Sequence, residues 1–193
     1  MFKFVVVATT LAVMSPAAQA QNFIARMSGP AEAPPNSSPG TGLAIVNYDP
    51  VSHLMRVRAS FSGLLGNVTV AHIHGATATP LTGTAGVITP TPTYPGFPAG
   101  NTFGFYDRTF DMTLSSSYNA AFITANGGTP ATAETAFINA MVAQRTYFNI
   151  HTSVFGGGEI RGFLVQTSAP EPGTLSLLGA VGVIGFALVR RRK

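Results

Sequence analysis

One stretch shows the fold class most clearly: residues 53–61 read HLMRVRASF. Its apolar side chains, from Met55 to Phe61, alternate with polar ones, which is the pattern of a strand with one buried face. Other short runs rich in Val, Ile, Phe and Tyr occur at residues 23–27, 42–48, 68–74, 103–114, 145–151 and 159–166. Turn residues such as Gly, Pro and Asn separate these runs. We therefore predict a mainly β fold, an antiparallel, Greek-key-like β-sandwich.

Two segments depart from the strand pattern. Thr129 is a favourable N-cap, Pro130 suits a first helical turn, and apolar residues then recur at three- and four-residue spacings. We predict one short helix at about residues 130–143. Residues 76–102 are rich in Thr, Pro and Gly, and we expect a long extended loop there, with a short strand at residues 83–88.

The positive charge of the chain is concentrated at its two ends. The formal charge is +4, but residues 21–169 contain six Arg and six acidic residues and are therefore neutral overall. No block of like charge remains there to follow a phosphate backbone, so we expect no nucleic-acid partner. The chain has no Cys, so packing must stabilise residues 21–169 without disulfides.

The N-terminus is typical of a secretory signal peptide. Lys3 supplies the positive charge, residues 4–14 form a short apolar core, and Ala18 and Ala20 provide the small residues that signal peptidase requires. We predict a signal peptide at residues 1–20 and a mature chain that starts at Gln21. A buried N-terminal helix or strand is the alternative.

The C-terminus has three parts in a fixed order. Pro170, Glu171 and Pro172 precede fifteen uncharged residues, 175–189, and the chain ends in RRRK. We predict an apolar transmembrane helix at residues 175–189, with its basic tail in the cytoplasm and its N-terminal end outside. The signal peptide directs the preceding domain to that same side. An ordinary membrane anchor is the alternative.

This order of motif, helix and basic tail resembles the PEP-CTERM sorting signal of Gram-negative bacteria over residues 170–193. The resemblance implies cleavage at the motif by an exosortase, a membrane-bound, transpeptidase-like cysteine protease. Together with the predicted signal peptide at residues 1–20, it divides the chain into that signal peptide, a domain at residues 21–169 and a sorting signal at residues 170–193. It also implies a precursor anchored in the inner membrane, which is then displayed on the cell surface or secreted.

Three histidines and one acid form the candidate site. Strand alternation places His72 and His74 on one face, and His151 lies on the polar face of a second strand. If the strands are neighbours, these side chains and Glu159 converge. Hydrogen-bond networks of such side chains more often stabilise a fold, and that is the interpretation we favour here. The alternative is a metal site of His72, His74, His151 and Glu159, because imidazole with a carboxylate suits zinc or copper.

Three motifs around these residues resemble the CHRD (chordin) domain: AHIHG at 71–75, YFNIHT at 147–152 and GGEIRG at 157–162. The resemblance covers about residues 22–166 and implies an immunoglobulin-like or superoxide-dismutase-like β-sandwich with no settled activity. The His-x-His strand is also similar to that of copper–zinc superoxide dismutase. The chain lacks that enzyme's Cys pair and an obvious bridging His, so we do not expect dismutation.

The sequence favours a binding or structural protein over an enzyme. It has no Gly-x-Ser-x-Gly elbow, phosphate loop or His-Glu-x-x-His motif. We predict a non-enzymatic protein of the cell envelope or extracellular matrix, processed by signal peptidase and exosortase. It would touch the membrane through its C-terminal helix before processing, and exopolysaccharide or envelope components are its expected partners. The alternative function is a redox-active zinc or copper protein.

Overall fold

The computed structural model describes residues 19–167, and the predicted signal peptide and C-terminal helix lie outside this described range. The described chain folds into eight strands and two α-helices. The strands are β1 (Gln21–Ser28), β2 (Thr41–Asp49), β3 (Leu54–Ser62), β4 (Val68–His74), β5 (Gly104–Asp111), β6 (Tyr147–Thr152), β7 (Ile160–Phe163) and β8 (Val165–Thr167); the helices are α1 (Ala120–Ala125) and α2 (Pro130–Val142). None of these helices is long and apolar enough to span a membrane.

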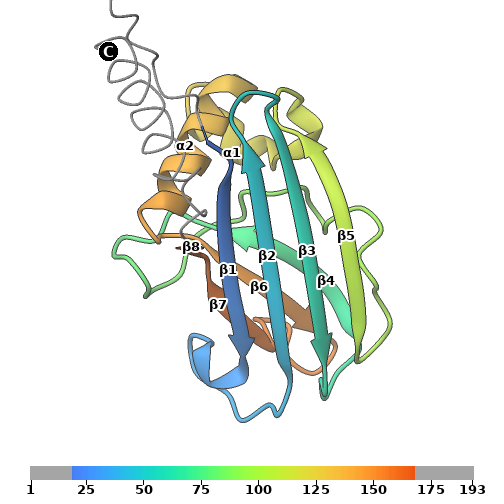
Figure 1. The fold of residues 1–193 in the computed structure, drawn as a ribbon. Coiled ribbons are helices and arrows are strands. Elements are labelled where there is room, and N and C mark those ends of the chain that lie inside the picture. The colour runs from blue at the N-terminus through green and yellow to red at the C-terminus, as the bar shows by residue number, and fades with distance from the viewer. Residues whose placement is uncertain (1–18, 168–193) are drawn as a thin grey trace, which may run out of the picture.

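The strands form one antiparallel sheet that curls into two layers. The order is β4-β6-β7-β1-β2-β3-β5, and β8 also pairs with β1. β1, β2, β3 and β5 make a long layer, and β4, β6 and β7 cross behind it (Figure 1). The two layers meet where Ser28 of β1 pairs with Arg161 of β7. This confirms the predicted mainly β, sandwich-like fold.

The core lies between the two layers. The alternation in β3 is as expected, since Met55, Val57, Ala59 and Phe61 are all buried. From the other layer, Phe148 and Ile150 of β6 are fully buried against the same core. Burying a side chain of this size stabilises the fold by about 1.5–3 kcal/mol. The inward face of β6 is therefore fixed by packing, which turns Asn149 and His151 to the opposite face.

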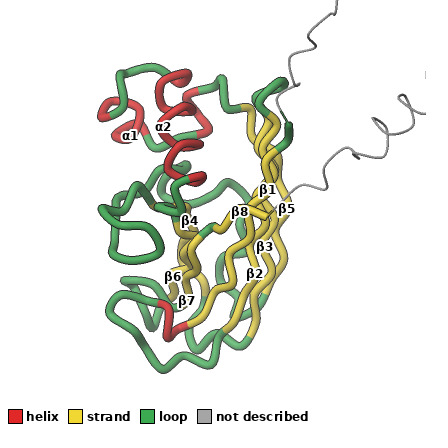
Figure 2. Tube along the Cα trace, turned by 60° about the vertical axis from the view of Figure 1, so that its left-hand side comes forward, coloured by secondary structure: helices red, strands yellow, loops and turns green. Residues whose placement is uncertain are grey.

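The helical region contains one helix more than predicted. The predicted helix is α2, and Thr129 caps it by accepting a hydrogen bond from the backbone of Thr132. α1 has six residues, too few to give a periodic apolar pattern, and Asn119 caps it. Both helices lie at one end of the two layers (Figure 2).

Two predicted strands also differ in detail. The run at residues 159–166 is two strands, because Leu164 is fully buried between β7 and β8 and donates its backbone N–H to Thr146. The strand expected at residues 83–88 is reduced to one bridge, between Val87 and His74. Residues 75–103 otherwise form a loop, as expected for this composition, and it packs beside β4.

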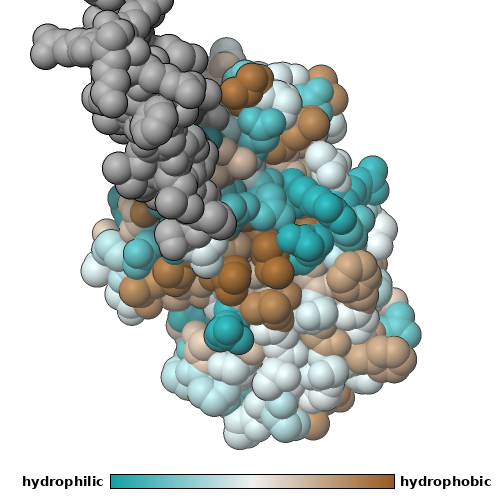
Figure 3. Space-filling model, in the orientation of Figure 1, coloured by the Kyte–Doolittle hydropathy of each residue, from teal (hydrophilic) through white to brown (hydrophobic). Residues whose placement is uncertain are grey.

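The outer face of the long layer is held by polar pairs between neighbouring strands. Figure 3 shows this face, where hydrophilic and hydrophobic side chains lie in adjacent bands. Asn47 accepts a hydrogen bond from Arg58 and donates one to Asn22. Arg56 binds the Asp107 carboxylate through two nitrogens, and both side chains are partly exposed. These groups stabilise the surface of the sheet, and the candidate site lies on the other layer.

Candidate functional site

The candidate site lies on the outer face of the second layer, where β4 and β6 are neighbours. The register pairs His72 with Asn149, His74 with Tyr147 and Val70 with His151. His72 is therefore diagonal to His151, a separation that side chains of this length can bridge. The structure brings together three of the four residues in the candidate metal site, His72, His74 and His151.

The three imidazole rings form an almost equilateral triangle. The ring centres of His72 and His74 are 5.6 Å apart, those of His72 and His151 are also 5.6 Å apart, and those of His74 and His151 are 5.7 Å apart. One nitrogen from each ring lies within 4.8 Å of the other two. His72 and His74 are buried, and His151 is half-buried.

Each ring is held by a backbone carbonyl. His72 Nε2 lies 2.5 Å from the Pro92 oxygen, and His74 Nδ1 lies 3.0 Å from the Ala85 oxygen. His151 Nδ1 lies 3.0 Å from the carbonyl oxygen of residue 156. A carbonyl oxygen only accepts hydrogen bonds, so in each ring the bonded nitrogen must carry the proton.

The second nitrogen of each ring is the one that matters for chemistry. His72 Nδ1, His74 Nε2 and His151 Nε2 are all buried and have no hydrogen-bond partner in the described protein. Burial lowers the pKa of all three rings, and it lowers that of His74 to about 4. The rings are therefore neutral at pH 7, and each free nitrogen offers a lone pair.

One aromatic and one cationic side chain, Tyr147 and Arg161, stack in sequence against the His74 ring. The Tyr147 ring is stacked on His74, with ring centres 4.9 Å apart and planes 5° from parallel. The Arg161 guanidinium lies 4.9 Å from the centre of the Tyr147 ring, a cation–π contact. Arg161 also donates to the Ala31 carbonyl and lies 3.8 Å from the Glu32 carboxylate. This column fixes the plane of the His74 ring.

Glu159, the fourth residue of the candidate metal site, lies apart from the three-histidine group. Its side chain is fully buried and accepts hydrogen bonds from Ser38, Thr152 and the backbone of Leu65 and Gly66. Burial alone would raise the pKa of this carboxyl, but these hydrogen bonds outweigh it and hold the pKa below its usual value. Glu159 therefore connects two loops to the sheet.

The alternation argument does not apply to Glu159 for a local reason. It lies in the bend before β7, not in the strand, and follows Gly158, whose φ is +127°. The remaining histidine, His53, lies outside the cluster, where its Nδ1 is 3.0 Å from Glu134.

Sequence reasoning missed Tyr147 and the three carbonyls. Tyr147 was detectable, because residues 147, 149 and 151 share one face of a strand. The carbonyls of Ala85, Pro92 and residue 156 were not, because the direction of a loop carbonyl depends on the path of the whole loop.

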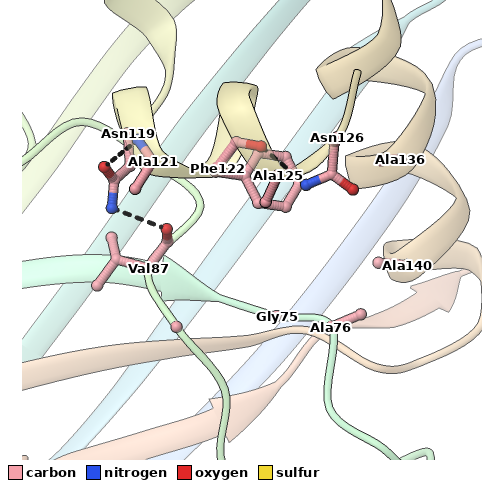
Figure 4. Close-up of a pocket in the computed structure, with 11 residues that line it drawn as sticks. Gly75, Ala76, Val87, Asn119, Ala121, Phe122, Ala125, Asn126, Ala136 and Ala140 are labelled. Atoms are coloured by element: carbon pink, nitrogen blue, oxygen red, sulfur yellow. Dashed lines mark hydrogen bonds between the residues drawn. The ribbon is translucent and has the colours of Figure 1, made fainter. Parts of the chain in front are cut away.

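A separate cavity of about 340 Å³ lies next to β4, between the loop and the helices. Figure 4 shows its lining, where Asn119 donates to the Val87 carbonyl and Phe122 lies at the wall. None of the residues that line it is ionisable. This cavity therefore offers shape but no acid, base or metal ligand, and the histidine cluster remains the stronger candidate.

Comparison with family models identifies the family of this domain. The model of the CHRD domain matches residues 23–164, which include both histidine strands and the bend at Glu159. The chain belongs to the CHRD domain family. The histidine cluster and the carbonyls that orient it thus lie within a single CHRD domain.

A second model, the PEP-CTERM protein-sorting motif, matches residues 168–193, which follow β8. This motif marks the chain as an exported protein that an exosortase processes from a membrane-anchored precursor. Comparisons with curated proteins and with solved structures give no match.

Proposed function

We propose that the exported CHRD domain is a non-enzymatic binding module of the cell envelope or extracellular matrix. The observation that carries this proposal is the bonding of the three clustered histidines. Each donates to a backbone carbonyl, whereas a histidine that acts in acid–base or nucleophilic catalysis works with a carboxylate or a nucleophile in reach. The cluster offers lone pairs for binding a ligand.

The acidic residues support the same proposal. All six acids of residues 21–167 contact other groups of the protein: Glu32 is paired with Arg161, Asp49 with Ser52, Asp107 with Arg56, Asp111 with Thr113, Glu134 with Tyr48 and His53, and Glu159 with its four donors. A pair of carboxylates for general acid and base chemistry would need two acids that face one substrate. Their present contacts stabilise turns, strand pairs and loops.

His53 is the described histidine that faces a carboxylate, that of Glu134. Tyr48 donates a hydrogen bond to the same carboxylate at 2.8 Å. In residues 19–167 no nucleophile is hydrogen-bonded to the second nitrogen of His53, which a catalytic triad would require. We therefore assign His53 and Glu134 to fixing the start of β3 against α2.

Sorting provides the first test of this function. We expect Glu171→Gln to prevent removal of the C-terminal segment, so that the full-length chain stays in the membrane fraction. Asp49→Asn is the matched control, because it removes one negative charge at the end of β2, far in the sequence from the sorting motif. Fractionation followed by intact-mass measurement separates the outcomes. If the Glu171→Gln chain is released with its C-terminal segment removed, as the unsubstituted chain is, exosortase-dependent display is contradicted.

Binding provides the second measurement. After processing, we expect the domain to sediment with exopolysaccharide or envelope material from the producing cells. Recovery of the whole processed domain in the soluble medium, with none in the matrix or on the surface, would contradict the binding role. Turnover of any substrate by the purified chain would contradict its non-enzymatic character.

A further inference from the structure

We propose that His72, His74 and His151 bind one late transition-metal ion, zinc or copper. This inference rests on the binding role proposed above and names the ligand of the histidine cluster itself. It uses three of the four candidate site residues and omits Glu159, whose carboxylate is bonded elsewhere.

The size of the ring triangle fits a metal ion at its centre. With a metal–nitrogen bond of about 2.05 Å, imidazole centres lie roughly 3.2 Å from the ion and about 5.2–5.5 Å from one another. The observed separations are 5.6, 5.6 and 5.7 Å. The ring centres therefore lie within a few tenths of an ångström of the spacing that a bound ion requires, and the ligand nitrogens, now within 4.8 Å of one another, reach the ion by turning inward.

The protonation pattern favours a cation over water. The carbonyl bonds fix the proton on one nitrogen of each ring and leave three buried lone pairs directed away from those bonds. A water molecule has two hydrogens, so it can donate to only two of the three nitrogens. The third would remain an unsatisfied buried acceptor, which costs about 1–3 kcal/mol. One cation accepts all three lone pairs.

The carbonyls also provide the outer shell that metal-binding histidines need. A ligating imidazole usually donates its second N–H to a carbonyl, carboxylate or water, which fixes its tautomer and orientation. Pro92 and Ala85, which hold His72 and His74, both belong to the long loop at residues 75–103. The Thr- and Pro-rich loop therefore has a defined task, which is to orient two of the three ligands.

The donor set selects the class of metal. Neutral imidazoles suit zinc and copper, whereas calcium and magnesium require several oxygen ligands. In residues 19–167 the cluster has three members, so the protein supplies three ligands and a fourth position is open to water or another small ligand. The Arg161 charge lies behind Tyr147 and His74, outside the triangle of ligands.

Metal content and affinity of the full chain, purified in mild detergent, test the proposal. The chain is stripped with a chelator, incubated with Zn²⁺ or Cu²⁺ in separate samples, freed of excess metal and measured by mass spectrometry of the metal. We expect one ion per chain. A competition titration should show affinity weakened by a factor of roughly 100 or more in His151→Ala, since even loss of an orienting partner costs up to that factor.

His53→Gln is the matched control, because it removes a histidine outside the cluster. His151→Ala is the first variant to use, because His151 is the least buried ligand and its loss is the least disruptive to folding. Circular dichroism verifies that the variants are folded. Substitution with Co²⁺ gives an independent readout in the unchanged protein, since nitrogen ligands in a four-coordinate site produce strong visible absorption.

The possible results lead to distinct conclusions. Stoichiometric binding of one metal and not the other supports the site and identifies its ion, and binding of both supports it with a preference given by the two affinities. Substoichiometric binding of both metals, or equal binding by His151→Ala and His53→Gln, overturns the proposal. Neither failure affects the sorting test with Glu171→Gln, so loss of the metal site and loss of the exported role are distinguishable.

Discussion

Replacing Glu159 by glutamine should destabilise the CHRD domain strongly, although the two side chains have nearly the same shape. Ser38 Oγ and the Leu65 backbone N–H each donate to one carboxylate oxygen at 2.6 Å. The Gly66 backbone N–H and Thr152 Oγ donate to the other oxygen, at 3.1 and 2.7 Å. Glutamine keeps one oxygen and places an amide NH₂ where the other was.

The magnitude follows from this mismatch. A hydroxyl can rotate to accept a hydrogen bond from the new NH₂, but a backbone N–H cannot, so one buried donor loses its acceptor. Such a loss costs about 1–3 kcal/mol, and the remaining bonds lose the added strength that a charged acceptor provides. We expect a total of about 2–4 kcal/mol, which lowers the melting temperature of a domain of this size by roughly 5–15 °C.

The effect should also depend on pH with a definite sign. The pKa of Glu159 is lower in the folded protein than its ordinary value of 4.5. The charged carboxylate therefore contributes stability that is complete above pH 4.5 and is lost as the pH falls through the folded pKa. The difference in melting temperature between the unchanged chain and Glu159→Gln should be largest at neutral pH and should narrow in acid.

Thermal melts followed by circular dichroism, from pH 3 to 7, measure both effects. Asp107→Asn is the control, since it removes the same charge from a partly exposed pair with Arg56, where solvent screens the interaction. A Glu159→Gln variant that melts within about 1 °C of Asp107→Asn, or a difference that widens in acid, would refute the hydrogen-bonding argument.

Two further substitutions test other buried positions. Burial raises the pKa of Glu32 to about 7 against the attraction of Arg161, so the folded protein loses stability as the pH rises from about 4.5 to 7. Glu32→Gln should flatten this decline in melts from pH 5 to 8, and an unchanged slope would show that the carboxyl is not the cause. A Cβ at residue 162 would collide with the backbone carbonyl of Arg26, so Gly162→Ala should cost about 3 kcal/mol or more. Gly157→Ala, where a Cβ has open space, should melt like the unchanged chain, and equal melting of both variants would contradict the proposed collision.

Local patterns were sufficient to predict most of the strands. In β3 every second residue from Met55 to Phe61 is buried, because a pleated strand turns alternate side chains to one side. The cap at Thr129 likewise marked the start of α2. α1 escaped detection because six residues carry too little periodicity, and the break at Leu164 depends on contacts distant in the sequence.

The site was predictable as far as the alternation of side chains along a strand applies. Strand alternation placed His72, His74 and His151 on the outer face of their strands. The register of β4 with β6 then brought them together. Strand alternation did not predict the position of Glu159, because that residue precedes β7 and follows a glycine with positive φ. The tautomers of the rings depend on the carbonyls of Ala85, Pro92 and residue 156, whose directions emerge only when the loops have folded.

The pairing of the first and last strands of the domain has a mechanical consequence. Asn22 of β1 faces Thr167 of β8, so the chain leaves the domain beside the place where it enters. In the anchored precursor, tension from the membrane reaches the domain at Thr167 and acts first on the three pairs between β8 and β1. These pairs can peel apart in turn and release about 10 Å of chain. Leu164 is fully buried, so we expect it to resist further extension and β8 to be the first part of the domain that yields.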